Sequence, residues 1–443
     1  MLFQFKPLRL FDCWFISQIF DLFEQMTDNN YGQLTDEWSL ELPQHKKQDE
    51  AHQNSTKEGS TLKDSVKIQT ELQSYGKIFT SLLSSSIPSI FYLVSMLFIV
   101  ATTLHFVGKS DDTALYNGTA LGNSTLYCLS MYLIISLNMG FTAIASQAYG
   151  SGLHKLVGLY LHRNIIINLG LTSLVYILLY FSYNMFISIG IEEDIARVAS
   201  YYLRYSPFLT FGMILYDNLK CYLYAHDIYT PQFFMQIVLA IIHWFSCDYF
   251  INSMQLGIKG VTIVMTLSSC LGNLFMMVYF TVSNPDERSW FCLRKESFQE
   301  LFALFKRELP IAAMVYFEWI VFHILVFMAS YLGKQDMAAF VTLSNAQSLL
   351  YVVPLGLSIS VTTLVGNAVG EKNHEKTMRM IKASVFTGLI VLSSMTVIFY
   401  FYRHLISYFY VHDPQILASL DKLYDVYIFA MPADFLQCIL GGV

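Results

Sequence analysis

Long apolar segments separated by short polar ones run through most of this chain, from about residue 79 to Val443. About 20 mostly apolar residues suffice for a helix to cross the hydrocarbon core of a bilayer. Ten stretches reach that length and are predicted to span a membrane: 79–107, 125–149, 160–190, 197–225, 230–253, 258–283, 309–333, 337–369, 377–410 and 420–443. The sequence therefore predicts an all-α, polytopic membrane protein.

The composition agrees with this prediction. Hydrophobic residues make up 54% of the 443 residues and charged residues only 14%, whereas soluble domains carry about 25% charged residues. The seven cysteines are scattered, and the sequence contains no CxxC pair and no histidine cluster at metal-binding spacing. Neither a disulfide framework nor a metal site is predicted.

Two polar segments divide the chain. Residues 1–75 are predicted to be a cytosolic tail, amphipathic at its start and disordered after it. Residues 1–26 fit either a helix lying on the membrane surface or a non-native leader sequence. Residues 284–308 are charged and are expected to link a first lobe, 76–283, to a second lobe, 309–443.

Basic residues predict the orientation in the membrane. Most Lys and Arg outside the helices fall on the side of the N-terminus, as expected for the cytosolic side. Two glycosylation sequons, at Asn117 and Asn123, fall in the loop predicted after the first helix, on the outer side.

The two lobes carry matching features. Three pairs of residues hold equivalent places, with sequence offsets of 220, 222 and 225: Gly150 and Gly370, Pro88 and Pro310, and Pro207 and Pro432. A nearly constant offset indicates an internal duplication with parallel repeats. The complete design would have two six-helix lobes, and the second lobe, with four helices up to Val443, is expected to lack about two.

Two acids are predicted deep inside the membrane. Glu318 lies eight residues past Pro310, roughly 12 Å along its helix. A carboxylate at that depth costs about 2.5–3.5 kcal/mol, and such acids mark ion and proton pathways. Asp434 has a similar depth on a helix that enters from the opposite face, so the two are expected to bind and release a proton or cation together. The alternatives are a neutral Glu318 that packs inside the bundle and an Asp434 that caps backbone freed by Pro432.

Other ionisable groups are secondary candidates. Asp217 and Lys220, three residues apart, are expected to pair on one helix face, and a structural ion pair is favoured over a substrate site. Asp248 has no local partner in the sequence and is the best acid for a site in the first lobe, with Asp217 as the other candidate.

Aromatic residues near Glu318 are possible substrate contacts. Tyr316 and Trp319 suit an organic cation through cation–π contact, although most aromatic residues of such a chain pack in the core. His323 lies about 140° around the helix from Glu318, so an ordinary interior histidine is favoured over a substrate contact.

At these residues the chain resembles the multidrug and toxic compound extrusion transporters, over about residues 75–443. The similar motifs are SQAYGSG at the end of the second helix, VTTLVGNAVGEKN at the end of the eighth, Phe317-Glu318-Trp319, Pro231-Gln232, Leu256-Gly-Ile-Lys-Gly260 and Leu440-Gly-Gly-Val443. The resemblance implies a V-shaped protein of two lobes around a central cavity. It also implies export of organic cations and xenobiotics in exchange for H⁺ or Na⁺, with Glu318 and Asp434 in binding and coupling.

The chain also departs from that family. Bacterial members often carry an acid in the first helix, and the matching stretch from Pro88 has none. Some relatives have a second Glu where His323 stands and an Asn where Asp248 stands. Both departures bear on the charge of the substrate.

These observations predict a cation-coupled multidrug antiporter in a plasma, vacuolar or vesicle membrane. It is expected to be a monomer without a cofactor other than the coupling ion, to bind no nucleic acid and to be no enzyme. A flippase for lipid-linked oligosaccharides is one alternative, disfavoured because few basic residues lie within the helices. A receptor, a membrane enzyme and an inactive truncated transporter are the others.

Overall fold

Residues 60–109, 112–329, 334–410 and 414–443 are described by the computed structural model, and every regular element in these ranges is a helix. The predicted amphipathic segment 1–26 lies outside the described residues. Val66–Val443 group together by their internal contacts. The division into tail, lobes and linker stays a prediction.

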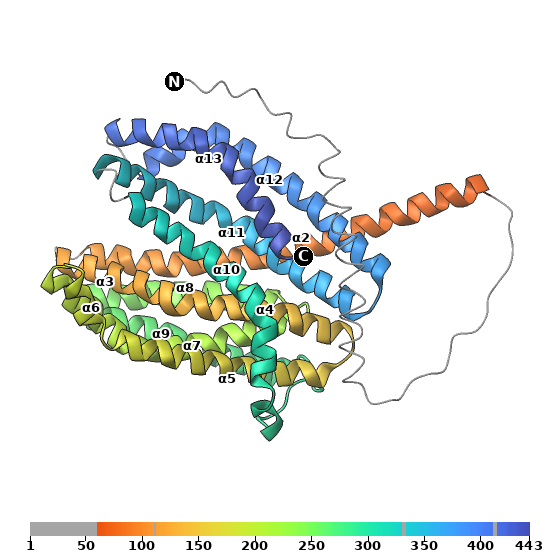
Figure 1. Ribbon diagram of the computed structural model, residues 1–443, viewed down its shortest axis with the longest axis horizontal. Helices are drawn as coiled ribbons and strands as arrows, with labels where there is room; N and C mark the ends of the chain where they lie inside the picture. The colour runs from red at the N-terminus through yellow and green to blue at the C-terminus, as the bar shows by residue number, and fades with distance from the viewer. Residues whose placement is uncertain (1–59, 110–111, 330–333, 411–413) are drawn as a thin grey trace. The chain divides into compact units, whose positions relative to one another are not determined.

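Within the described residues, eight α-helices form the first half and four form the second (Figure 1). The first-half helices are α2 (Ser60–Gly108), α3 (Thr113–Leu126), α4 (Tyr132–Gly150), α5 (His154–Leu179), α6 (Ser182–Ser188), α7 (Glu193–Ala225), α8 (Thr230–Cys247) and α9 (Ile258–Ser283). Two π-helical turns, η1 (Tyr127–Met131) and η2 (Asp248–Ser253), join α3 to α4 and extend α8. After a 3₁₀ turn, η3 (Lys295–Phe298), the second half has α10 (Leu301–Ala329), α11 (Lys334–Gly370), α12 (His374–Tyr410) and α13 (Pro414–Gly441).

Nine of the ten predicted spans correspond to one continuous helical segment each, whereas the predicted span 160–190 is divided into α5 and the short α6. Nine helices in the described ranges are long and apolar enough to cross a membrane. The helix α7 is not among these nine. Its polar residues, including Asp217, Asn218 and Lys220, are buried inside the protein. A hydropathy measure counts these residues as if they faced lipid, so it undervalues α7.

Other helix boundaries also differ from the predictions. The helix α2 begins at Ser60, so residues 60–75 are helical rather than irregular. The helix α10 begins at Leu301, inside the stretch expected to be a linker. In place of the loop predicted to hold the sequons, α3 forms a helix capped by the Asp112 carboxylate, which accepts from the Leu115 N–H at 2.9 Å.

Two glycines explain why α3 packs as a helix. A Cβ atom on Gly118 would lie 2.5 Å from Cβ of Val198, and one on Gly122 would lie 2.9 Å from the Tyr202 ring. Only hydrogen fits at both places, so α3 packs directly on α7. The sequon residue Asn123 lies on this helix and accepts from the Tyr202 hydroxyl at 3.3 Å.

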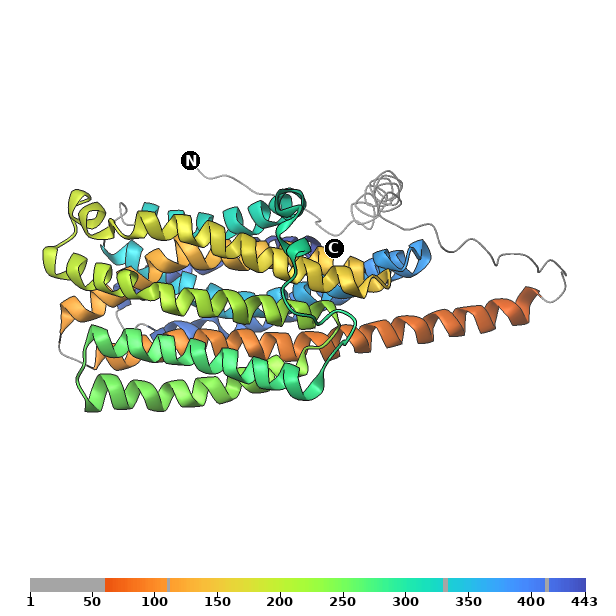
Figure 2. The same cartoon turned by 90° about the horizontal axis from the view of Figure 1, so that it is seen from below.

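Each half has a hydrophobic core of its own, and a third cluster joins Leu82 of α2 to Leu357 of α11 and Ile439 of α13. One core, which includes Phe106, Leu126 and Tyr202, lies within the first lobe. Another, which includes Phe399 and Tyr424, lies within the second. Between them α4 packs against α11 and α10, while it also packs on α5 and α7 of its own lobe (Figures 1 and 2).

Candidate functional site

A cavity of about 800 Å³ lies between the two lobes. Its volume is within the range of about 300–1,000 Å³ typical of ligand pockets. The walls are mostly apolar and aromatic. They come from α2, α3, η1, α4 and α7 of the first lobe and from α10 and α11 of the second. A cavity shared by the two lobes changes shape whenever the lobes move against each other.

Glu318 and Asp434 meet the same face of α11. The Tyr351 hydroxyl donates to Oε1 of Glu318, and Nε2 of Gln347 donates to Oδ2 of Asp434 at 3.3 Å. Gln347 and Tyr351 are four residues apart, and such residues are neighbours on a helix surface, with Cβ atoms about 5–6 Å apart. The structure therefore brings the two predicted acids together across α10, α11 and α13, close enough to interact electrostatically.

Both acids adjoin the central cavity through their hydrogen-bond donors. Tyr351 and Gln347 line the cavity, while Glu318 and Asp434, which accept hydrogen bonds from them, are half-buried and not part of the lining. Among the described residues, neither carboxyl group is paired with a Lys, Arg or His side chain. A carboxylate without a cation is costly away from water, so each group can be stabilised by a proton or a cation.

Of the three predicted substrate contacts, two line the central cavity and one does not. Trp319 and His323 line the cavity, and both rings pack on Tyr132 of α4, with centroids 5.0 Å and 5.4 Å from its ring. Tyr316 instead donates its hydroxyl to the Cys128 carbonyl at 3.2 Å and is not part of the lining. As the helical geometry predicted, Glu318 and His323 face different neighbours, namely α11 and α4.

The predicted ion pair between Asp217 and Lys220 is confirmed. Both side chains are buried, at 5% and 7% exposure, and both line the cavity on the side of the first lobe. The second carboxylate oxygen of Asp217 accepts from Nδ2 of Asn138 at 2.7 Å. The Lys220 ammonium group also lies 4.9 Å from the centre of the Tyr92 ring.

A network of asparagines extends from this pair, and the sequence analysis did not anticipate it. Asn164 and Asn168 donate to Oδ1 of Asn138 at 2.7 Å and 3.0 Å, and Asn164 also donates to Asn218 at 2.9 Å. All four are buried. The spacing of four residues between Asn164 and Asn168 places them on one helix face, which is the signal that would have revealed them.

Asp248 lies away from these groups. It is exposed at the end of α8 and accepts from Nδ2 of Asn252 at 3.1 Å, so the prediction that it has no local partner is wrong. The structure does not bring it to Asp217 or to the cavity.

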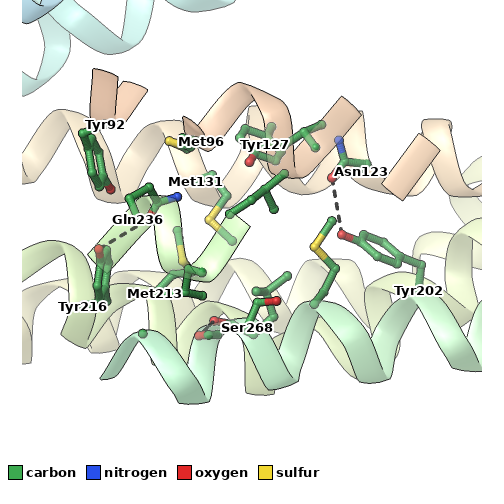
Figure 3. A pocket seen from close by; sticks show the side chains of 17 residues that line it. Tyr92, Met96, Asn123, Tyr127, Met131, Tyr202, Met213, Tyr216, Gln236 and Ser268 are labelled. Carbon is green, nitrogen blue, oxygen red and sulfur yellow. Dashed lines mark hydrogen bonds between the residues drawn. The ribbon is translucent and has the colours of Figure 1, made fainter. Parts of the chain in front are cut away.

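A second, smaller pocket of about 70 Å³ lies inside the first lobe. Its walls include Met131, Met213 and Ser268, and Figure 3 shows two hydrogen bonds at its edge. The Tyr202 hydroxyl donates to Asn123, and the Tyr216 hydroxyl donates to Gln236 at 3.3 Å. The asparagine of the second sequon is therefore part of an internal wall.

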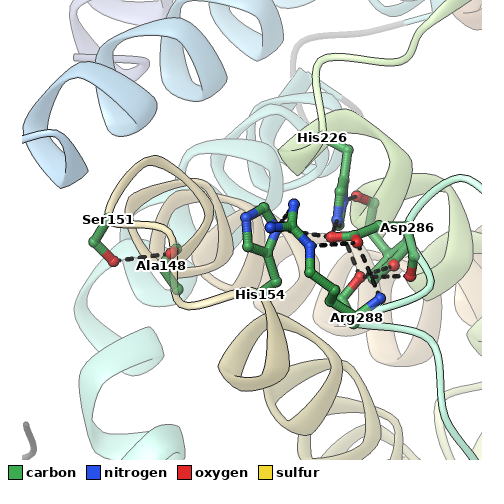
Figure 4. A network of polar contacts seen from close by, with 8 residues as sticks. Ala148, Ser151, His154, His226, Asp286 and Arg288 are labelled. Carbon is green, nitrogen blue, oxygen red and sulfur yellow. Dashed lines mark hydrogen bonds and ion pairs between the residues drawn. The ribbon is translucent and has the colours of Figure 1, made fainter.

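A polar network holds residues 284–300 against the first lobe (Figure 4). Asp286 binds Nδ1 of His154 at 2.7 Å and lies 3.4 Å from Nε of Arg288, while His226 approaches the same carboxylate at 3.5 Å. Burial opposes ionisation of Asp286, but the Arg288 backbone N–H and His154 outweigh it and lower the pKa of Asp286. Burial also lowers the pKa of His226.

Comparison with known proteins agrees with this architecture. The family model described as MatE matches residues 88–248 and 310–443. The chain belongs to the MatE family. This MatE protein is therefore a multi-pass membrane transporter and not an enzyme, and the predicted all-α fold is confirmed.

Its relatives are distant in sequence. Protein DETOXIFICATION 36 of Arabidopsis thaliana is 24% identical over 392 residues, which cover 86% of this MatE chain and 77% of the relative. Multidrug and toxin extrusion protein 1 of Danio rerio is 23% identical over 350 residues, or 79% and 59% of the two chains.

Solved structures share the fold of this MatE protein. The eukaryotic MATE transporter AtDTX14 aligns with a TM-score of 0.78 at 18% identity, over 83% of this chain and 82% of that one. VcmN of Vibrio cholerae aligns with a TM-score of 0.71 at 14% identity, over 84% and 85% of the two chains.

Proposed function

We propose that this protein exports organic cations or other xenobiotics across a membrane in exchange for H⁺, with Glu318 and Asp434 as the coupling site. The observation that carries the proposal is the meeting of both acids on one face of α11 beside the central cavity. The names of the relatives, which refer to detoxification and multidrug extrusion, support the substrate class.

The geometry suggests how a proton competes with substrate. Each acid has a neutral donor and lacks a cationic partner within the described ranges, so a proton or a cationic substrate stabilises the same carboxylates. When Glu318 gains a proton, the hydrogen bond that it accepts from Tyr351 loses its charge and becomes weaker. The helix that carries Tyr351 also packs on α4 of the other lobe, so this change acts on the contact between lobes.

The cavity wall suits an organic cation. Trp319 and Tyr132 present ring surfaces to the cavity, and aromatic faces attract cations, more strongly when water is excluded. Lys220 is the one Lys or Arg residue in the described lining, and it is paired with Asp217. Little positive charge is therefore left to hold a phosphate, which counts against the flippase.

Proton coupling can be tested in liposomes that contain the purified protein. Efflux of a fluorescent organic cation is measured under an imposed pH gradient for the native protein and for Glu318→Gln and Asp434→Asn. We expect both substitutions to abolish pH-driven efflux. Asp248→Asn, which removes an exposed acid away from the cavity, is the matched control and should retain it.

A second arm replaces the pH gradient by a Na⁺ gradient at constant pH. Efflux driven by Na⁺ that is lost in Glu318→Gln would assign the same site to sodium rather than to protons. Normal pH-driven efflux by Glu318→Gln would rule out the coupling site.

A further inference from the structure

Glu308 is a third acid in a setting that the export cycle described above does not use. Its side chain is fully buried, at 0% exposure, where α10 packs against α4. A Cβ atom on Gly140 of α4 would lie 3.0 Å from both Cβ and the carbonyl oxygen of Glu308. The two helices thus touch at this point, and the carboxyl group is enclosed in the contact between the lobes.

Neither carboxyl oxygen of Glu308 has a hydrogen-bond partner among the residues that the structure describes. The ionisable groups on the helices around α10 are engaged elsewhere, so far as the structure describes them. Arg163 of α5 binds Glu300, Tyr160 accepts from Arg307, and Tyr351 of α11 binds Glu318. On α4, Tyr132 packs on Trp319 and His323, and Tyr149 packs on His154 and His226.

An ionised carboxylate in this position would be buried without a cation or a donor. Such burial is so unfavourable that the group takes up a proton instead. The contact between α10 and α4 therefore requires a neutral Glu308. If the lobes separate at this point, water reaches the carboxyl group and can solvate its charge.

The position of Glu308 along α10 indicates on which side of the membrane this contact lies. Glu308 lies ten residues before Glu318 on α10, about 15 Å along the helix. We call the end of the bundle where α4 and α11 terminate, at Gly150 and Gly370, the linker end. Glu308 contacts Gly140, ten residues before that end of α4, whereas Trp319, beside Glu318, packs on Tyr132 at the start of α4. Glu308 therefore lies inside the bundle, nearer to the linker end than Glu318. The basic loops predict that the linker end faces the cytosol.

We propose that Glu308 is a proton-binding site that controls closure of the lobes at the linker end. A carboxylate oxygen of Glu308 gains a proton from water as α10 closes on α4, and the O–H bond breaks and returns the proton to water when the lobes part. This proposal rests on the proposed function in one respect, namely that the lobes separate during transport. It does not involve Glu318 or Asp434.

A cysteine at the closed contact reports on this step. Ser146 of α4 is fully buried against Gly366 of α11 at the linker end, so Ser146→Cys reacts with an impermeant maleimide only when the lobes part. The other cysteines within reach of a maleimide are first replaced by Ser. They are the exposed Cys270 and Cys292, the partly exposed Cys128, Cys221 in the cavity wall, and Cys13 outside the described residues. Labelling is measured on the full chain in lipid nanodiscs across a range of pH.

Two proteins that both carry Ser146→Cys are compared at each pH, one with the native Glu308 and one with Glu308→Gln. The decisive quantity is the labelling rate of the first divided by that of the second. The pH dependence of the thiol itself cancels in this quotient. One linked proton changes the open-to-closed ratio by about tenfold per pH unit once Glu308 ionises in the open state. We expect the quotient to rise accordingly with pH. Glu308→Ala should behave like Glu308→Gln, so one poorly folded variant does not decide the result.

Two controls separate this site from others. Glu296→Gln removes an exposed acid of the nearby η3 turn and should leave the response unchanged. The response should also persist in Glu318→Gln, so failure of the coupling site and failure of this proposal are distinguishable. A quotient that stays flat with pH, or a response lost in His226→Gln rather than in Glu308→Gln, would overturn the assignment.

Discussion

Gly150 and Gly370 each lie against the helix of the other. A Cβ atom on Gly150 would overlap the carbonyl group of Asn367, and one on Gly370 would overlap the carbonyl group of Gln147. Gln147 and Asn367 have the same sequence offset as the two glycines, so the contact is reciprocal, as across a two-fold axis. The duplication seen in the sequence thus produces a symmetric closure of the linker end.

This closure should fail when either glycine gains a side chain. Gly150→Ala and Gly370→Ala should each force α4 and α11 apart, and overpacking of this kind typically costs about 1–3 kcal/mol. We expect a lower midpoint of thermal unfolding in detergent and faster labelling of Ser146→Cys. Gly170→Ala is the matched control, because a Cβ atom there meets nothing within 4 Å; equal behaviour of the three variants would contradict the close contact.

The ion pair of Asp217 and Lys220 should be sensitive to the loss of one partner. Lys220→Met leaves Asp217 buried with only the amide of Asn138 as donor, and breaking a buried pair in this way costs about 3–5 kcal/mol. Adding Asp217→Asn removes the remaining charge and should restore part of the stability. The midpoint of thermal unfolding measures both effects, with the exposed Lys382→Met as control; a double variant less stable than the single one would refute this account.

Acid should loosen the network around Asp286. Burial holds the pKa of His226 below its usual 6.5, so the unfolded chain binds a proton that the folded chain excludes. The contribution of His226 to the free energy of unfolding is therefore fully present above pH 6.5, and it declines as the pH falls below 6.5. The lowered pKa of Asp286 adds stability that is present above its usual value of 3.8 and is lost only below it.

We therefore expect the unfolding midpoint to fall between pH 7 and pH 5, and to fall less in His226→Gln. The measurement is thermal unfolding at a series of pH values in one detergent. His105→Gln changes an exposed histidine and serves as the control. An unaltered pH slope in His226→Gln would mean that other groups govern acid stability.

Much of this protein was determined by local sequence. The positions of the helices follow from apolar length, and the repeat follows from matched Gly and Pro positions. The pairing of Asp217 with Lys220 was predictable because both lie on one helix, where a spacing of three residues fixes their proximity. Glu318 and Asp434 were found because an acid inside an apolar span is costly wherever that helix packs.

Only the tertiary structure decided how these helices face one another. In the folded protein, Tyr351 and Gln347 donate hydrogen bonds to the two acids, and Asn138 donates one to Asp217. Asp248 lies on the surface, and Glu308 is buried against Gly140. Each of these facts depends on the rotation of a helix about its axis and on its partner far along the chain. In a bundle whose helices are apolar on many sides, the local pattern does not specify that rotation, because packing between lobes sets it.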